Sequence, residues 1–366
     1  MNREDYIAEA ERQLHVHDSV VTDDGTTLPY YKSVDQKEIH KQYKEVEDVL
    51  KEGVQNGYIS KELAADLLPP KAKGGSLYFL RKTHKPFEGN MPKGHPIVSS
   101  SGTNTERISS VFCDQAVKYQ LKDIKTYLKD TPDLLQKINV INDSGEVPDG
   151  TIPISIDLVS MYTRLPLDEG IAAFKVALDK LTDKTVPTEF ILKLLRMVME
   201  QNIFMFNNQA WLQLLGTSMG SRVSPTYACL FMSLLEESML ENCPQHLKQY
   251  LYLWLRYIDD YLLFWSRTWD QFMEFYEYLN NFHKTMKFDK PQYDQETNSC
   301  NFLDLKISIE NKKILTDLYK NQLFSTIFCT YSSNFHHILL FHPLCTFFGL
   351  FKGFNWPPGP RTMLMG

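Results

Sequence analysis

Short apolar runs alternate with amphipathic stretches through the middle of the chain, and this pattern predicts a mixed α+β fold. Residues 151–162 are a β-branched run typical of a strand, whereas residues 169–181 and 188–202 carry apolar positions at helical spacing. Two further apolar runs meet at Asn207-Asn208, a pair that favours a hairpin turn. The order of these elements differs from the regular strand–helix alternation of a parallel sheet.

A largely apolar helix is predicted to begin at Ser224 and Pro225, which suit its N-cap and its first position. Because this helix is apolar around most of its circumference, it must be buried, most simply against a sheet. The later runs predict a hairpin, a helix and two strands, over residues 254–265, 272–286, 301–309 and 313–319 in turn.

The first 70 residues are predicted to form helices with solvated faces, for example over residues 41–57. The Pro- and Gly-rich segment 67–75 breaks any helix and marks a boundary. Two short strands are then predicted over residues 77–80 and 96–98, and we expect the cationic loop between them to bind phosphate groups.

The stretch after these strands predicts one amphipathic helix and the start of another. Thr131 and Pro132 suit the N-cap and the first position of the second helix, and residues 142–151 have the composition of a loop. The first helix rests on four apolar residues at helical spacing, Val117, Leu121, Ile124 and Leu128.

Composition supports a globular protein. Of the 366 residues, 23% are charged and 13% are aromatic, which excludes a disordered chain. The six cysteines show no metal-binding spacing, and residues 1–14 lack an apolar signal core, so we expect an intracellular protein with reduced thiols. The apolar residues after 320 are interrupted by Asn, Ser, His and Pro343 before a membrane span is reached, so we expect no membrane partner.

The net charge of −6 is unfavourable for a nucleic-acid protein, but the charge is unevenly distributed. Residues 1–70 hold eight Lys and Arg against fifteen Asp and Glu, whereas residues 71–95 hold six Lys and Arg against a single acid. The local basic excess therefore permits contact with phosphates despite the overall acidity.

The most informative polar residues are Asp259 and Asp260, adjacent carboxylates within an apolar, strand-forming run. Charges in such surroundings are costly unless they are paired or coordinated, so a cation should meet them. Asp157 follows another apolar strand run, 102 residues earlier. Two such acids side by side would form a hard oxygen site suited to Mg²⁺. A simple turn is the alternative for the adjacent pair alone.

Three motifs in this order and spacing, SIDLVSMYTRLP, GTSMGSRVSP and RYIDD, resemble the central motifs of reverse transcriptase palms. The residues of these motifs are most similar to those of Penelope-like retroelements. LRKTHKP and HPIVSSSGTNTE resemble the fingers motif of these enzymes, and FNNQAWLQLLGTSMGS, NFLDLKI and TDLYK match the same pattern. The resemblance covers roughly residues 60 to 320.

The resemblance implies an RNA-directed DNA polymerase with a right-hand α+β fold, which acts in the nucleus on an RNA template, a DNA primer and deoxynucleotides. Its GIY-YIG nuclease has no counterpart in this chain, and we expect a truncated copy of the element. The implied segments are an N-terminal helical region, the fingers, the palm and a truncated or altered thumb, over residues 1–75, 76–150, 151–310 and 311–366.

The resemblance also implies roles for individual residues. Asp157, Asp259 and Asp260 would be the catalytic acids that hold two Mg²⁺ ions, with Asp260 in an assisting role. Tyr162 stands where these enzymes carry an aromatic steric gate that excludes a 2′-hydroxyl, although a core tyrosine is the alternative. The other implied contacts are to the nucleotide, by Lys82, His95, Gly220 and Ser221, and to template or primer, by Lys85, Ser224, Pro225 and Tyr257.

Three residues depart from the family pattern. His95 replaces the usual arginine, and a neutral imidazole cannot substitute for a forked guanidinium on a triphosphate. Cys229 replaces the usual asparagine, and Arg222 is bulkier than the usual residue. Two alternatives therefore accompany the polymerase prediction: an inactive relic that only binds nucleic acid, and an active domesticated polymerase akin to telomere-extending enzymes.

Overall fold

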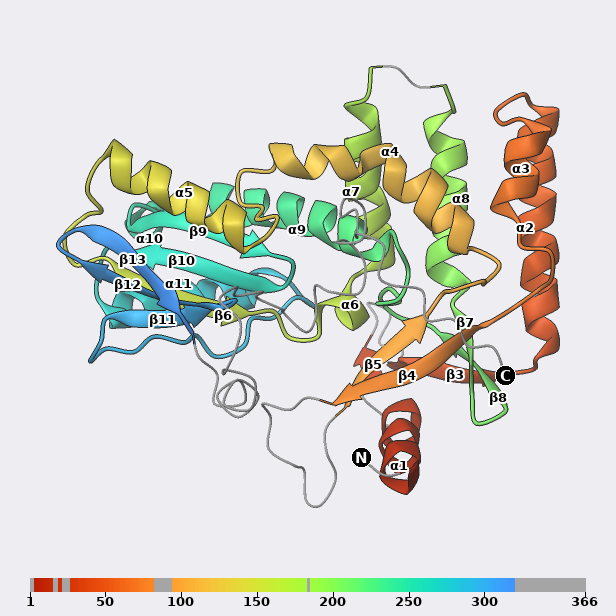
Figure 1. Cartoon of the computed structure of the whole chain (residues 1–366), viewed down its shortest axis with the longest axis horizontal. Helices are drawn as coiled ribbons and strands as arrows, with labels where there is room; N and C mark the ends of the chain where they lie inside the picture. The colour runs from red at the N-terminus through yellow and green to blue at the C-terminus, as the bar shows by residue number, and fades with distance from the viewer. Residues whose placement is uncertain (1–2, 16–18, 22–26, 82–93, 183–184, 320–366) are drawn as a thin grey trace, which may run out of the picture.

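The computed structural model describes residues 3–15, 19–21, 27–81, 94–182 and 185–319 (Figure 1). Within these ranges the strands form sheets in the orders β6-β10-β9, β11-β12-β13, β3-β8-β7-β4-β5 and β1-β2, so the predicted mixed α+β class is confirmed. The strands are β1 (Ser19–Val21), β2 (Thr27–Pro29), β3 (Tyr31–Val34), β4 (Gly75–Arg81), β5 (Gly94–Ser99), β6 (Ile152–Asp157), β7 (Ile203–Phe206), β8 (Gln209–Gln213), β9 (Leu251–Tyr257), β10 (Asp260–Trp265), β11 (Ser299–Phe302), β12 (Leu305–Glu310) and β13 (Lys313–Leu318).

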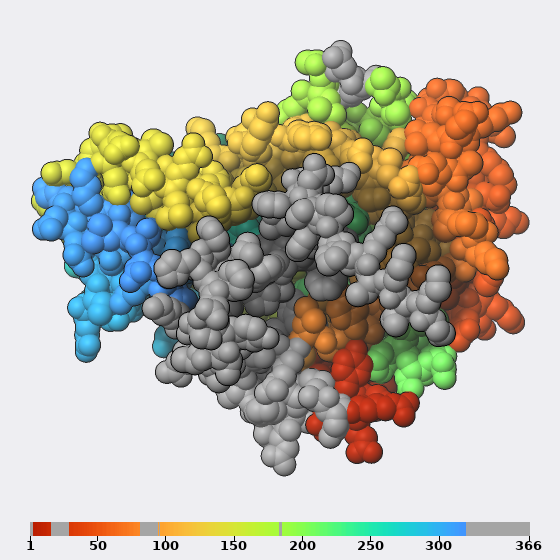
Figure 2. Space-filling model, in the orientation of Figure 1, coloured from red at the N-terminus to blue at the C-terminus, as the bar shows by residue number. Residues whose placement is uncertain are grey.

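Different helices lie at the two ends of the molecule. Figure 2 shows α5 and β13 side by side at one end, with α2 and α3 at the other. Within the described ranges, none of the helices combines the length and the apolar character needed to cross a lipid bilayer. The helices are α1 (Arg3–His15), α2 (Lys37–Gln55), α3 (Lys61–Leu67), the π-helix η1 (Ile108–Asp114), α4 (Gln115–Val117), the 3₁₀-helix η2 (Lys118–Asp123), α5 (Thr131–Ser144), α6 (Met161–Arg164), α7 (Leu167–Asp179), α8 (Thr188–Glu200), α9 (Ser224–Glu241), α10 (Gln245–Lys248) and α11 (Trp269–Phe282).

The central sheet β6-β10-β9 is covered on both faces. Tyr261, Leu263 and Trp265 of β10 face a core shared with α7, α9 and α11, whereas Leu262 and Phe264 face a second core with α5 and β11–β13. Because successive side chains of a strand point to opposite faces, a strand covered on both sides needs an apolar residue at every position. This double burial explains why the β10 run is continuously apolar.

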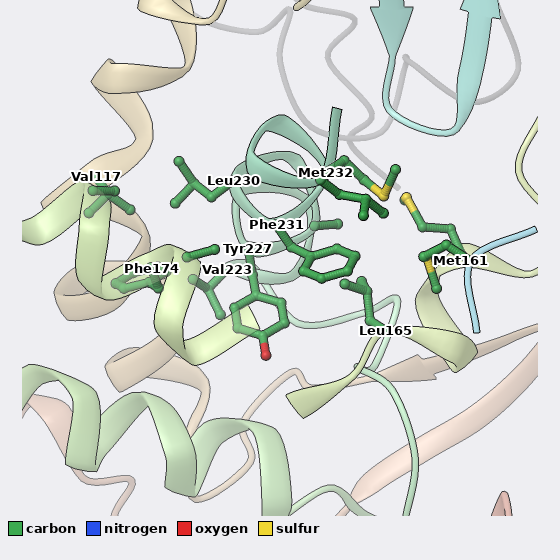
Figure 3. Close-up of a cluster of buried hydrophobic side chains, with 14 of the residues drawn as sticks. Val117, Met161, Leu165, Phe174, Val223, Tyr227, Leu230, Phe231 and Met232 are labelled. Atoms are coloured by element: carbon green, nitrogen blue, oxygen red, sulfur yellow. The ribbon is translucent and has the colours of Figure 1, made fainter. Parts of the chain in front are cut away.

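Helix α9 is buried within the larger core, as its apolar circumference predicts (Figure 3). Tyr227 and Phe231 of α9 lie among Phe174 of α7, Met161 of α6, and Leu165, which follows α6 directly. Burial of each such side chain contributes about 1.5–3 kcal/mol to folding. The helix thereby fixes the position of the central sheet against the helical layer.

The predicted N-cap of α9 is wrong by one residue. Val223 occupies the N-cap, and Ser224 is the first helical residue, with Pro225 just after it. The hydroxyl of Ser224 instead donates to the carbonyl of Ser218 at 2.6 Å, and the Val223 amide donates to Ser109 Oγ at 3.0 Å. The helix start is therefore capped by a residue from a distant segment, which local spacing does not reveal.

The five-stranded sheet combines distant parts of the chain. Its β4–β5 and β7–β8 pairs match the predicted strands, and Asn207 and Asn208 have the positive φ values that a tight hairpin turn requires. Strand β3 pairs with β8, and β4 pairs in parallel with β7. The sheet thus draws on three of the four predicted segments, and their boundaries stay a prediction.

The predicted single helix through residues 117–128 is wrong. Helical structure ends at Asp123, and the chain then runs along the edge of β9, where Leu128 N donates to the Arg256 carbonyl at 2.7 Å. Val117 packs in the larger core, but Leu128 packs in the second core on the other side of the sheet. One helix could not reach both cores, so pairing with β9 overrides the local helical pattern.

The next helix begins close to the predicted position. Asp130, one residue before the predicted N-cap Thr131, caps α5, and its carboxylate accepts a hydrogen bond of 2.9 Å from Asp133 N. The helix continues to Ser144, so the loop predicted over residues 142–151 begins three residues later than predicted, at Gly145. An aspartate competes well with a threonine for an N-cap, which accounts for the shift.

Candidate active site

The three predicted carboxylates meet at one end of the central sheet. Strands β6 and β10 pair antiparallel with Asp157 opposite Asp260, and β9 and β10 form a hairpin with Tyr257 opposite Asp260. Asp259 lies in the turn of this hairpin, and its carbonyl accepts a hydrogen bond of 2.9 Å from Leu158 N. The strand register therefore brings together carboxylates that are far apart in the sequence.

These carboxylates differ in their surroundings. Asp157 is exposed, whereas Asp259 and Asp260 are half-buried. Burial, the negative charges of Asp259 and Asp157, and a hydrogen bond with Asp157 together raise the pKa of Asp260 to about 8. Repulsion between the acids is thus relieved by a proton that Asp260 retains at neutral pH.

The carboxylate oxygens are the ligand type that Mg²⁺ prefers, although they do not form a preformed metal cage. Within the described ranges, no group of three or more His, Cys, Asp and Glu side chains has the spacing of a ready-made metal cage. Mg²⁺ commonly binds through only one or two carboxylates, and phosphate and water oxygens fill its other positions. A divalent cation would also neutralise the crowded negative charge that holds the proton on Asp260.

The stability of the metal-free protein should depend on this proton. Because folding raises the pKa of Asp260 from 3.8 to about 8, the folded state binds the proton more tightly than the unfolded state. The resulting stabilisation is complete below about pH 4 and is lost as the pH rises to about 8. In EDTA, we expect the Tm of the wild type to fall over this interval more steeply than that of Asp260→Asn. Equal slopes in scanning calorimetry would contradict the assignment.

The predicted nucleotide loop, residues 216–225, is held by buried hydroxyl groups. Ser221 Oγ lies 2.8 Å from Ser109 Oγ, and Ser218 Oγ donates to the Val98 carbonyl at 2.9 Å. Ser224 Oγ lies 2.6 Å from Thr217 Oγ1, and it is fully buried. Since Ser221 and Ser224 use their hydroxyls within the protein, they shape the loop, and their contact with a substrate stays a prediction.

Gly220 brings this loop against the end of β5. It forms a parallel bridge with Ser99, and its carbonyl accepts a hydrogen bond of 2.7 Å from Ser100 Oγ. A Cβ atom at Gly220 would lie 1.9 Å from the carbonyl oxygen of Val98, a clash that only glycine avoids. The glycine therefore permits the five-stranded sheet to meet the loop through backbone atoms.

Tyr162 lies on the short helix α6, a few residues after Asp157. Its carbonyl accepts a hydrogen bond of 2.7 Å from Thr217 N, which joins α6 to the nucleotide loop. Burial, together with the neighbouring Cys229 and Asp259, raises the pKa of the Tyr162 phenol. The half-buried ring therefore stays neutral near the turn between β9 and β10, residues 258–259, which we call the carboxylate turn.

The remaining predicted residues are only partly placed. Lys82 and Lys85 lie outside the described residues, and so does the side chain of His95. The backbone of His95 lies in β5, opposite Leu80 of β4. Pro225 is exposed at the start of α9. Their roles in binding nucleotide or template stay predictions.

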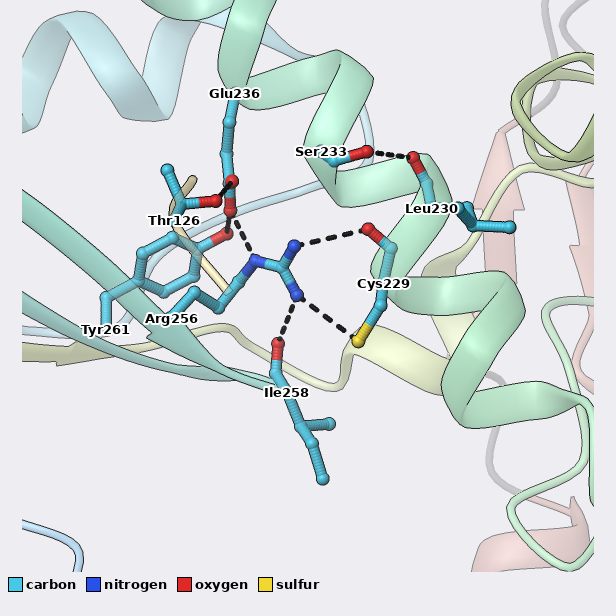
Figure 4. Close-up of polar contacts among 8 residues, drawn as sticks. All are labelled: Thr126, Cys229, Leu230, Ser233, Glu236, Arg256, Ile258 and Tyr261. Carbon is cyan, nitrogen blue, oxygen red and sulfur yellow. Dashed lines mark hydrogen bonds and ion pairs between the residues drawn. The ribbon is translucent and has the colours of Figure 1, made fainter. Parts of the chain in front are cut away.

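The sequence interpretation missed a buried ion pair beside the carboxylate turn (Figure 4). Arg256 and Glu236 are 0% and 1% exposed, and Arg256 Nε contacts the Glu236 carboxylate. The hydroxyls of Tyr261 and Thr126 donate to the same carboxylate at 2.7 and 2.5 Å. An arginine within an apolar strand run and an acid within an apolar helix were the available signals, since such charges need partners.

Comparison with solved structures shows what kind of fold surrounds this site. Telomerase from Candida albicans, in complex with a TWJ fragment of telomeric RNA, matches with a TM-score of 0.50 at 13% identity. The match covers 81% of this chain and 53% of that one. The fold is like that of telomerase, a reverse transcriptase. Apo telomerase from Candida tropicalis, truncated from its C-terminal domain, gives a TM-score of 0.48 at 13% identity, over 70% of this chain and 59% of that one.

The chain therefore spans between half and three fifths of the length of these telomerase structures. No protein-family model matches the chain, and no curated protein matches its sequence. Within the reverse-transcriptase-like fold, one hydrogen bond joins the end of β6 to the turn between β9 and β10, and another joins α6 to the loop 216–225. These elements carry the three carboxylates, Tyr162 and Gly220.

Proposed function

We propose that this chain is the RNA-directed DNA polymerase of a Penelope-like retroelement, which adds deoxynucleotides to a primer 3′-hydroxyl by a two-metal reaction. The observation that carries the proposal is the antiparallel register that sets Asp157 opposite Asp260, with Asp259 in the adjoining turn. The likeness to a telomerase solved with RNA supports a polymerase that copies an RNA template. The motifs most similar to Penelope-like elements support the finer assignment.

The three carboxylates would have different roles in catalysis. Asp157 and Asp259 would hold the two Mg²⁺ ions, and Asp260 would orient Asp157 through their hydrogen bond. The bound ions would lower the pKa of the primer 3′-hydroxyl and neutralise charge on the incoming triphosphate. The protein needs no general base, because phosphoryl transfer depends mostly on positioning and charge stabilisation. Gly220 and Ser221 would place the nucleotide through the backbone of their loop.

Primer extension tests the proposal directly. Purified chain is incubated with Mg²⁺, deoxynucleotides and a DNA primer annealed to an RNA template, and product length is read on a sequencing gel. We expect extension that EDTA abolishes. Folded protein that binds the primer–template but gives no product with Mg²⁺ or Mn²⁺ would overturn the polymerase proposal in favour of the inactive relic.

Removal of the Tyr162 ring should relax sugar selection. If the ring lies under the nucleotide sugar, Tyr162→Ala should raise the use of ribonucleotides relative to deoxynucleotides by about 10- to 200-fold in kcat/KM. Tyr162→Phe keeps the ring and should discriminate as the wild type does. If the alanine variant folds, polymerises and still discriminates fully, Tyr162 is a core residue alone.

A further inference from the structure

The carboxylate turn adopts a backbone conformation that its sequence does not favour. Ile258, the first residue of the turn, has φ of +55°, and β-branched side chains rarely occupy this region. Such a conformation persists only where the surrounding structure imposes it. Hydrogen bonds hold the turn: Leu158 N donates to the Asp259 carbonyl at 2.9 Å, and Arg256 Nη1 donates to the Ile258 carbonyl at 3.2 Å.

The guanidinium that holds the turn is itself fixed to helix α9 (Figure 4). Arg256 Nε contacts Glu236, Nη2 donates to the Cys229 carbonyl at 3.2 Å, and Nη1 also lies 3.5 Å from Cys229 Sγ. Cys229 and Glu236 are seven residues apart, so they present one face of the helix across two turns. Because these contacts hold the guanidinium group along this face of α9, Nη1 points toward the Ile258 carbonyl.

The backbone of Arg256 is held as firmly as its side chain. Arg256 N donates to the Thr126 carbonyl at 2.6 Å, and Leu128 N donates to the Arg256 carbonyl at 2.7 Å. Thr126 also donates its hydroxyl to Glu236, which links this edge segment to the ion pair. The helix therefore holds the Arg256 side chain, the edge segment holds its backbone, and the side chain also donates to the turn.

On the basis of the polymerase function proposed above, we propose that Arg256 is a positioning residue that sets the place of Asp259. It transmits the position of α9 to the turn through the Ile258 carbonyl, and it need not touch substrate. A lysine could pair with Glu236, but its single nitrogen cannot span the helix and the turn at once. The proposal differs from a purely structural ion pair, which would stabilise the core without ordering the turn.

The test compares Arg256→Lys with Tyr227→Phe. Tyr227 lies on α9, the helix that carries the Arg256 partners Cys229 and Glu236, and its replacement removes a partly buried hydrogen bond of 2.8 Å to the Leu167 carbonyl that is not among the Arg256 contacts described above. Hydrogen–deuterium exchange is followed for peptides that cover residues 257–262 in metal-free protein. We expect at least about tenfold faster exchange in Arg256→Lys and wild-type exchange in Tyr227→Phe. We also expect a kcat roughly 10- to 100-fold lower in Arg256→Lys, with an unchanged KM for deoxynucleotide, because small displacements of reacting groups cost this much.

Turn exchange at the wild-type rate in folded Arg256→Lys would overturn the proposal, and so would an equal effect in Tyr227→Phe. If Arg256→Lys does not fold, the double variant Arg256→Met/Glu236→Met is read in the same way, because it leaves no unpaired buried charge. The exchange measurement needs no catalysis. An inactive wild type would therefore refute the polymerase function while the positioning role is still decided by exchange at the turn.

Discussion

Primer extension is expected to fall by roughly 10³-fold or more when Asp259 is replaced by alanine, because each metal-binding carboxylate supports several kcal/mol of charge stabilisation. Asp259 lies in the turn next to Asp260, and Asp260 pairs with Asp157 across the sheet. Without Asp259, the remaining pair offers too few ligands for two ions. The measurement is the single-nucleotide extension rate at saturating Mg²⁺ and deoxynucleotide, with folding checked by circular dichroism.

Asp168→Ala is the matched control for this substitution. Asp168 is an exposed acid in the first turn of α7, and its ion pair with Arg196, at 2.6 Å, is a surface interaction worth about 1 kcal/mol or less. We expect its extension rate to equal that of the wild type. An Asp259→Ala variant that keeps its rate within tenfold of the control would show that Asp259 is not a metal ligand.

A large loss of stability is expected on replacement of Gly216. Its φ is +68°, and a Cβ atom there would lie 2.1 Å from the Tyr162 carbonyl oxygen and 2.6 Å from the backbone of Thr163. Gly216→Ala should lower the free energy of unfolding by about 3–5 kcal/mol, through the left-handed backbone and the clash together. Because the clash falls on the helix that carries Tyr162, sugar discrimination should weaken as well. Urea unfolding measures the loss of stability.

Gly150→Ala separates the two causes. Gly150 has nearly the same φ, +73°, but no neighbouring atom lies within 4 Å of the position that a Cβ would take there. This variant should lose only the conformational part, about 1–2 kcal/mol. Equal losses for the two alanine variants would mean that the loop 216–225 can move away from Tyr162 with little loss of stability. The close approach of Gly216 to Tyr162 would then not be needed to hold α6 in place.

Local patterns predicted those elements whose structure depends on near neighbours in the sequence. The hairpin at Asn207-Asn208 follows from residues that accept positive φ, and the buried α9 follows from its apolar circumference. The pairing of the acids in space followed only as an expectation, from two strand runs that each end in a carboxylate. The resemblance to reverse transcriptases supplied the polymerase function, which the patterns alone left open.

The errors arise where distant segments compete for the same backbone groups. Residues 124–128 have a helical pattern, but the open edge of β9 offers hydrogen bonds and a second core for Leu128. The α9 start is capped by Ser109, which lies 114 residues before Val223. In both places the decisive partner lies far along the chain, so no local spacing could indicate it.

By itself, the sequence determined the α+β class, most strands and helices, and the three carboxylates on which the proposed chemistry depends, because these follow from local periodicity and from charges set in apolar runs. Only the tertiary structure decided that Asp157 stands opposite Asp260, that Gly220 joins the nucleotide loop to β5, and that Arg256 reaches from α9 to the turn. The physical reason is that strand register, close backbone approach and the pairing of buried charges are properties of segments packed together, and each segment carries only half of such a contact.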